Sequence, residues 1–189
     1  MSENIEQPKN ENSIDKNRRY CELEEELIVL FIKQISHELY NKALYLTFAN
    51  YFAIEGLPKL EQYYKERAEE EEKHHHWIYE WLSYNDVQFE YPNVEAINID
   101  IKDRIHPFKV TVDIEIETTD LIDKIMNAAI ELKDYRTIAW LNGGGPIEGK
   151  LIPEQAEEMS ISRTIRDMAE EENTSWQDKQ RTILDFYHS

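Results

Sequence analysis

Residues 68–81 read AEEEEKHHHWIYEW, and this stretch decides how the rest of the chain is interpreted. On a helix, Glu71 and His74 lie one turn apart on the same face. The stripe that a helix usually buries, counted in steps of three and four from this pair, comprises Leu60, Tyr64, Arg67, Ile78 and Trp81. A buried carboxylate is costly unless an opposite charge or a metal ion compensates it. The pattern therefore indicates a metal site, although the same letters also fit a solvated run of charges.

The bulk composition excludes several classes of protein. The chain has 189 residues, enough for one domain with a substantial core, and its formal net charge is −18. This charge argues against nucleic-acid binding, because contacts to phosphates need basic patches. The single cysteine, Cys21, forms no disulfide within the chain, so we expect a reduced thiol and a cytoplasmic location. No apolar run of about 18 residues predicts a membrane span, and the first 20 residues lack the apolar core of a signal peptide.

Two long helices are expected in the first half of the chain. The first runs from about residue 23 to residue 53, and Gly56 shortly after it stops the helical pattern. The second runs from about Pro58 to Tyr84. Because only residues 55–57 join them, these helices must be antiparallel neighbours. Residues 86–107 have no helical stripe, and their length suits a crossover along the bundle.

The third helix is ambiguous in sequence. Residues 109–117, KVTVDIEIE, alternate between apolar and polar with a period of two, which is a strand signal. A helical stripe through Val112, Glu115 and Ile122 also fits, and it continues to about Trp140. We expect a helix, because the second half is plainly helical and nothing breaks the chain between the halves. Glu115 then points inward, whereas on a strand it would face solvent.

A definite break, NGGGPIEGK, occupies residues 142–150. A fourth helix is expected from Pro153 to about Glu172, with Gln155 and Glu158 in its stripe. Residues 176–187 predict a short fifth helix.

Each of the four long helices thus carries one glutamate in its inward stripe: Glu38, Glu71, Glu115 and Glu158. Four buried carboxylates would repel one another strongly without cations between them. Oxygen-rich ligands with a single histidine suit two iron or manganese ions rather than structural zinc or copper.

These features together resemble the bacterial non-haem ferritins over about residues 25–185. The resemblance rests on HELYNKALY (37–45), the stretch 50–74, EIETTDLIDKI (115–125), KDYRTIAWL (133–141) and PEQAEE (153–158). It implies an all-α, ferritin-like four-helix bundle with a long crossover between the second and third helices and a short fifth C-terminal helix. Residues 21–189 would form this domain, and residues 1–20 a polar N-terminal extension. The spacings of 33 residues from Glu38 to Glu71 and 44 from Glu71 to Glu115 match the family and support the helical register of Glu115.

The resemblance also implies a ferroxidase centre for two iron ions. Glu38, Glu71 and His74 would bind the first ion. Glu71, as a bridge, would bind the second ion together with Glu115 and Glu158, and Gln155 would lie beside it. The remaining residues that the resemblance implies are Tyr45, as the catalytic tyrosine near the centre, and Glu70, Glu154 and Glu157, which with Glu158 would hold a third ion. Tyr45 also fits a simple core aromatic. Because haem-containing bacterioferritins have histidine where this chain has Glu158, no haem is expected.

The implied function is iron storage with ferroxidase activity, in which Fe(II) is oxidised and the ferric mineral is kept inside a homo-oligomeric cage of twenty-four subunits. One alternative is a ferritin-like structural protein that assembles without turnover. Another is a smaller dimetal oxidoreductase of the rubrerythrin or ribonucleotide-reductase type. The latter is disfavoured, because such proteins carry two Glu-x-x-His pairs and this chain has only Glu71 and His74.

The chain departs from the family just before the fourth helix, where about seven residues, 144–150, are inserted. In ferritins this end of the helix borders the three-fold channel, so we hypothesise that the insertion reshapes ion entry, with Glu148 as a contact. Gly143 falls where the family has a tryptophan close to the centre, and Trp140 is the nearest substitute.

Overall fold

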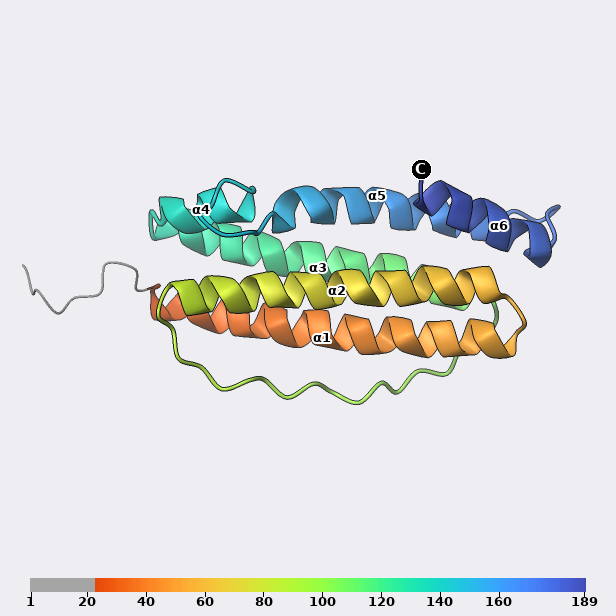
Figure 1. Ribbon diagram of the computed structural model, residues 1–189, viewed down its shortest axis with the longest axis horizontal. Helices are drawn as coiled ribbons and strands as arrows, with labels where there is room; N and C mark the ends of the chain where they lie inside the picture. The colour runs from red at the N-terminus through yellow and green to blue at the C-terminus, as the bar shows by residue number, and fades with distance from the viewer. Residues whose placement is uncertain (1–22) are drawn as a thin grey trace, which may run out of the picture.

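The structure, a computed structural model, describes residues 23–189, and within this range the chain forms six helices and no strand (Figure 1). The helices are α1 (Glu25–Ile54), α2 (Pro58–Tyr84), α3 (His106–Glu131), α4 (Tyr135–Leu141), α5 (Leu151–Glu170) and α6 (Trp176–Tyr187). The four long helices α1, α2, α3 and α5 lie side by side as a bundle (Figure 1). The all-α bundle expected from the sequence is therefore confirmed. The expected extension, residues 1–20, and Cys21 lie outside the described residues.

The hairpin of α1 and α2 forms as its short connection requires. Gly56 has φ +70°, a left-handed conformation that a residue with a Cβ rarely adopts. This conformation lets the chain reverse its direction shortly after the end of α1. Pro58 then occupies the first turn of α2, where its missing N–H costs nothing.

Residues 109–117 are helical, so the helical interpretation was the right one. Val112 and Glu115 are buried on one face of α3, whereas Ile116 is exposed. The predicted continuation of this helix to Trp140 was wrong, because α3 ends at Glu131. Lys133 has φ 57°, and the Asp134 carboxylate accepts hydrogen bonds from the backbone amides of Arg136 and Thr137, which starts α4 as a separate helix.

Residues 85–105 carry no helix or strand and connect the end of α2 to the start of α3 at the opposite end of the bundle (Figure 1). This crossover is fastened to α1, because Ser36 Oγ donates a hydrogen bond to the Asn93 carbonyl and Arg104 pairs with Glu55 at 2.7 Å. The predicted crossover is therefore present. No helix within residues 23–189 combines the length and apolar character that a membrane span needs.

The last helix folds back along the bundle instead of leaving it. Ser175 caps α6 by accepting a hydrogen bond from the Asp178 amide, and the helix then packs against α2 and α5. Tyr187 reaches the Tyr63 ring, with 4.9 Å between the ring centroids. The C-terminal turn of α6 thus lies over the first half of α2.

Two apolar clusters fill the bundle, one on each side of a polar layer. The first includes Phe31, Trp81 and Trp140, and the second includes Phe52 and Tyr64. Trp140, the expected substitute for the family's tryptophan near the centre, stacks on Trp81 with 4.9 Å between the ring centroids. The residues of the candidate site lie in the layer between the clusters.

Candidate metal centre

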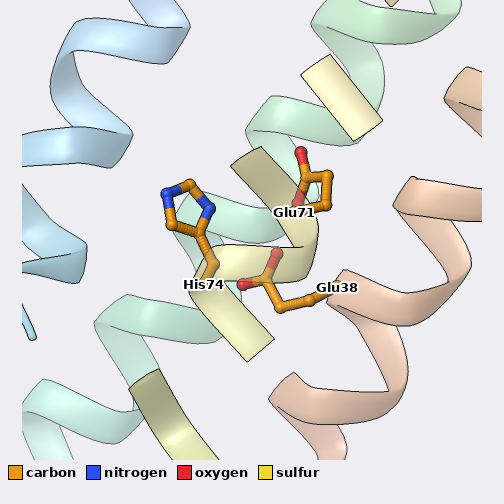
Figure 2. A group of neighbouring side chains, drawn as sticks. All are labelled: Glu38, Glu71 and His74. Carbon is orange, nitrogen blue, oxygen red and sulfur yellow. The ribbon is translucent and has the colours of Figure 1, made fainter. Parts of the chain in front are cut away.

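Four helices bring the inward glutamates to one buried layer. Glu38 comes from α1, Glu71 and His74 from α2, Glu115 from α3 and Glu158 from α5. Their side chains are almost completely buried, because none of these residues exposes more than 5% of its surface. Figure 2 shows Glu38, Glu71 and His74 close together between α1 and α2. The bundle therefore brings together all five residues that were expected to bind the two principal ions.

These residues form groups with the spacing that a metal ion requires. Glu38, Glu71 and His74 each offer a ligand atom within 4.8 Å of the others, and so do Glu71, Glu115 and Glu158. Glu71 belongs to both groups, as a bridging ligand would. These are the two ligand sets that the sequence resemblance implied.

Several ligand atoms in this layer have no hydrogen-bond partner within residues 23–189. They include Glu38 Oε2, Glu71 Oε2, His74 Nε2 and Glu158 Oε1, each shielded from solvent. Buried polar atoms are normally paired, since an unpaired one costs free energy on folding. Carboxylate oxygens with one imidazole match the donor set that iron and manganese accept, so the layer fits a pair of divalent ions.

The pKa values of the centre reflect burial and the charges of neighbouring side chains. Burial raises the pKa of the Glu71 carboxyl well above its usual value, and the neighbouring Glu38 raises it further. Burial also raises the pKa of Glu158 to about 7. Burial alone would lower the pKa of His74, but Glu158, Glu154 and Glu38 outweigh it and raise this pKa to about 9. The raised pKa values mean that these groups retain protons more readily than exposed ones, which reduces the negative charge of the buried layer.

Neighbouring side chains hold the carboxylates in place. The Tyr45 hydroxyl donates to Glu115 Oε1 at 2.7 Å, and Gln155 Nε2 donates to Glu115 Oε2 at 2.9 Å. Gln34 Nε2 donates to Glu38 Oε1 at 2.6 Å, a contact that the sequence did not reveal. Hydrogen bonds of this kind orient ligands around a metal. Tyr45 and Gln155 therefore lie at the centre as expected, while electron donation by Tyr45 stays a prediction.

The functional residue that sequence reasoning missed is Arg67. Its side chain is completely buried in the same layer. It donates a short hydrogen bond to Glu115 Oε1, and its guanidinium nitrogens lie 3.3 Å from Glu158 Oε1 and 3.8 Å from Glu71 Oε1. The signal was present, because Arg67 precedes Glu71 by one helical turn on the inward stripe. A buried cation there is the alternative compensation that the carboxylates required.

The residues expected to hold a third ion are placed unevenly. Glu70, Glu154 and Glu157 all line a cavity of about 560 Å³ between α2, α5 and the end of α6. Glu154 Oε2 lies 3.6 Å from His74 Nε2, too far for a hydrogen bond, but the attraction of that imidazole holds the pKa of Glu154 well below its usual value. Glu154 forms a third possible ligand group with His74 and Glu158. Glu70 pairs with Arg67 instead, and Glu157 is exposed, so neither joins a ligand group within residues 23–189.

The fold and the site define a ferritin-like protein. A family model for the ferritin-like domain matches residues 30–143, and the chain belongs to this family. The match ends before α5, so Gln155 and Glu158 are assigned to the site by the geometry of the bundle.

Relatives of known sequence agree with this assignment. The bacterial non-heme ferritin of Staphylococcus aureus strain USA300 is 28% identical over 142 residues, which are 75% of this chain and 81% of that protein. The same protein of strain MRSA252 is 27% identical with the same coverage. The resemblance to non-haem ferritins seen in the sequence is thereby confirmed.

Solved structures show the same fold. An open-pore ferritin of the archaeon Archaeoglobus fulgidus superposes with a TM-score of 0.77 at 21% identity, covering 86% of this chain and 96% of that chain. A closed form of the A. fulgidus ferritin, engineered by mutagenesis, gives a TM-score of 0.76 at the same identity.

Proposed function

We propose that this protein stores iron and oxidises Fe(II) at the buried centre. The observation that carries the proposal is the convergence of five ligand residues from four helices, with ligand atoms left unpaired in a water-poor layer. Membership of the ferritin-like family and relatives named bacterial non-heme ferritins support iron as the metal.

The oxidation of Fe(II) in this proposal depends on two ions that share the Glu71 carboxylate. Glu38, Glu71 and His74 hold one ferrous ion, and Glu71 with Glu115 and Glu158 holds a second one beside it. Two adjacent ions supply one electron each, and these electrons with two protons convert dioxygen to hydrogen peroxide, or peroxide to two water molecules. Anionic oxygen ligands favour the more highly charged ferric product, which lowers the free energy of the oxidised state.

The cavity beside the centre offers a route for the ferric product. Its walls carry Glu69, Glu70, Glu154 and Glu157, so a cation leaving the centre meets carboxylates. The net charge of −18 draws cations toward the protein. In this proposal a third ion binds at the cavity, twenty-four subunits form a cytoplasmic cage, and the mineral accumulates inside it.

One observation favours the second candidate, a ferritin-like protein that assembles without turnover. Arg67 already supplies a positive charge among the carboxylates, so the centre is partly compensated without any ion. Glu38 Oε2, Glu71 Oε2 and His74 Nε2 argue for the first candidate, because Arg67 leaves these three ligand atoms without hydrogen-bond partners.

An iron-oxidation assay separates the two candidates. Metal-free protein is loaded with Fe(II) under anaerobic conditions, exposed to dioxygen or peroxide, and followed by ferric absorbance. We expect rapid oxidation by the wild type and its loss in Glu71→Ala, with an unchanged particle size on gel filtration. The matched control is Glu72→Ala, which removes the neighbouring exposed carboxylate that pairs with Lys42.

Two results would contradict the proposal. Near-normal oxidation by Glu71→Ala would show that the ligand assignment is wrong. A wild-type protein that forms no ferric product above the protein-free background would favour the structural candidate.

A further inference from the structure

Arg67 lies against one of the two candidate ion positions and not equally against both. Its guanidinium contacts Glu71, Glu115 and Glu158, which are all three members of one ligand group. Within residues 23–189, no contact joins it to Glu38 or His74, so it reaches the other group only through the shared Glu71. The side chain therefore takes the place of a cation at the position of the second ion.

The unpaired ligand atoms divide in the same way. Glu38, Glu71 and His74 each keep one buried atom that has no hydrogen-bond partner among the described residues. In the second group, Glu158 Oε1 also lacks a hydrogen bond, but the Arg67 guanidinium lies 3.3 Å from it. Glu115 keeps no unpaired atom, because Arg67 and Tyr45 donate to its Oε1 and Gln155 donates to its Oε2. An ion can thus enter the first position without breaking a hydrogen bond, whereas one entering the second must displace donors from Glu115.

The charge balance favours removal of the guanidinium from the layer when a second ion binds. When ionised, the four glutamates carry four negative charges, which two divalent ions would balance by themselves. The guanidinium remains protonated in proteins and already balances one of these charges. One ion together with Arg67 leaves the layer one charge negative, and two ions with Arg67 leave it one charge positive in a low-dielectric interior. With two ions, the layer is neutral only when the guanidinium has turned out of it.

The Arg67 side chain has an alternative position available beside Glu70. Its Nη1 donates to Glu70 at 2.8 Å, and the Glu70 carboxylate is partly exposed. Arg67 and Glu70 both line the cavity of about 560 Å³ between α2, α5 and α6. A rotation of the arginine side chain toward Glu70 would open the second position and keep the guanidinium paired.

We propose that Arg67 makes the two ion positions unequal. It serves as a built-in cation at the second position, so that one divalent ion binds tightly to Glu38, Glu71 and His74. A second ion binds only after the guanidinium turns away toward Glu70. This inference rests on the proposed function, because it takes the centre to be the place where divalent ions bind.

The test is the number of tightly bound ions per chain. Metal-free full-length protein is titrated with Co²⁺ by calorimetry, and the visible absorption of Co²⁺ reports its coordination. We expect one tight ion per chain in the wild type and two in Arg67→Met, with the affinity for the second ion raised about tenfold or more as a buried like charge is removed. Arg67→Lys keeps the positive charge and is expected to retain one tight ion.

A matched control removes a positive charge from the same helix without touching the centre. Lys65 pairs with Glu61 on the surface of α2, so Lys65→Met should bind one tight ion like the wild type. If Arg67→Met fails to fold, Arg67→Gln removes the same charge and takes its place in the titration.

The outcomes distinguish this inference from the proposed function. Two tight ions of equal affinity in the wild type would overturn the inference and leave the ferroxidase proposal standing. A single tight ion in both the wild type and folded Arg67→Met would also overturn it. No tight ion in any variant would overturn both proposals.

Discussion

Replacing Arg67 with methionine should destabilise the metal-free protein strongly. The substitution keeps an apolar side chain of similar length but leaves Glu71, Glu115 and Glu158 facing one another without the guanidinium. Removing one partner of a buried ion pair typically costs about 3–5 kcal/mol. The pKa of Glu158 is already about 7, so this carboxyl can relieve part of the repulsion by taking up a proton near neutral pH. We therefore expect a loss at the lower end, about 3 kcal/mol.

For a domain of this size, about 3 kcal/mol lowers the midpoint of thermal unfolding by roughly 6–12 °C. The assay is far-UV circular dichroism on protein treated with a chelator at pH 7, repeated with saturating Co²⁺. Added metal should recover more of the midpoint in Arg67→Met than in the wild type, because an ion replaces the missing positive charge. Lys65→Met, which breaks only a surface pair, should shift the midpoint by no more than about 2 °C.

A metal-free Arg67→Met protein as stable as the wild type would refute this reasoning. It would mean that the guanidinium does not compensate the carboxylates, and that the charge argument for unequal ion positions lacks its physical basis.

Two further predictions concern the pH dependence of stability and the glycine-rich loop at residues 142–150, called the glycine loop below. The pKa values of Glu158, about 7, and His74, about 9, both lie above their usual values of 4.5 and 6.5, so the folded state binds these protons more tightly than the unfolded state. The thermal midpoint of metal-free protein should therefore fall as pH rises from 5 to about 9, less so below pH 7 in Glu158→Gln, and a flat or rising profile would contradict this. Gly149→Ala should destabilise the fold by about 1–3 kcal/mol and change tryptophan fluorescence, because the added Cβ would lie 2.0 Å from Trp140 Nε1. The control is Gly144→Ala, whose added Cβ would lie 3.3 Å from the Ala139 carbonyl oxygen. Equal stability of the two variants would contradict the packing argument.

For the glycine loop, the sequence predicted the position of the loop but not its contacts with Trp140. Its position before the fourth helix was identified, and its link to an ion channel remains a prediction that depends on neighbouring subunits. The structure gives a local reason for its glycines, since residues 145 and 149 lie against the Trp140 ring where a Cβ would clash. Trp140 Nε1 also donates a hydrogen bond to the Glu148 carbonyl, which fastens the loop to α4.

The sequence by itself determined the helices and the identity of most candidate ligands. Periodicity of three and four residues depends only on the local chain, so it located α1 and α2 and placed Glu38 and Glu71 on inward faces. Periodicity left Glu115 open between a strand and a helix, and the spacing shared with related proteins favoured the helix. The break between α3 and α4 escaped this reasoning, because it depends on one left-handed residue and one side-chain cap inside a continuous apolar pattern.

Only the tertiary structure decided what neutralises the buried carboxylates. Arg67 looked like one more residue in a helical stripe, and its partners Glu115 and Glu158 lie on α3 and α5, far along the chain. The packing of α2 against these helices places the guanidinium among the carboxylates, and it also turns α6 back over α2. Electrostatic pairing acts through space, so a pattern along one helix can show that a charge is buried but not which opposite charge it meets.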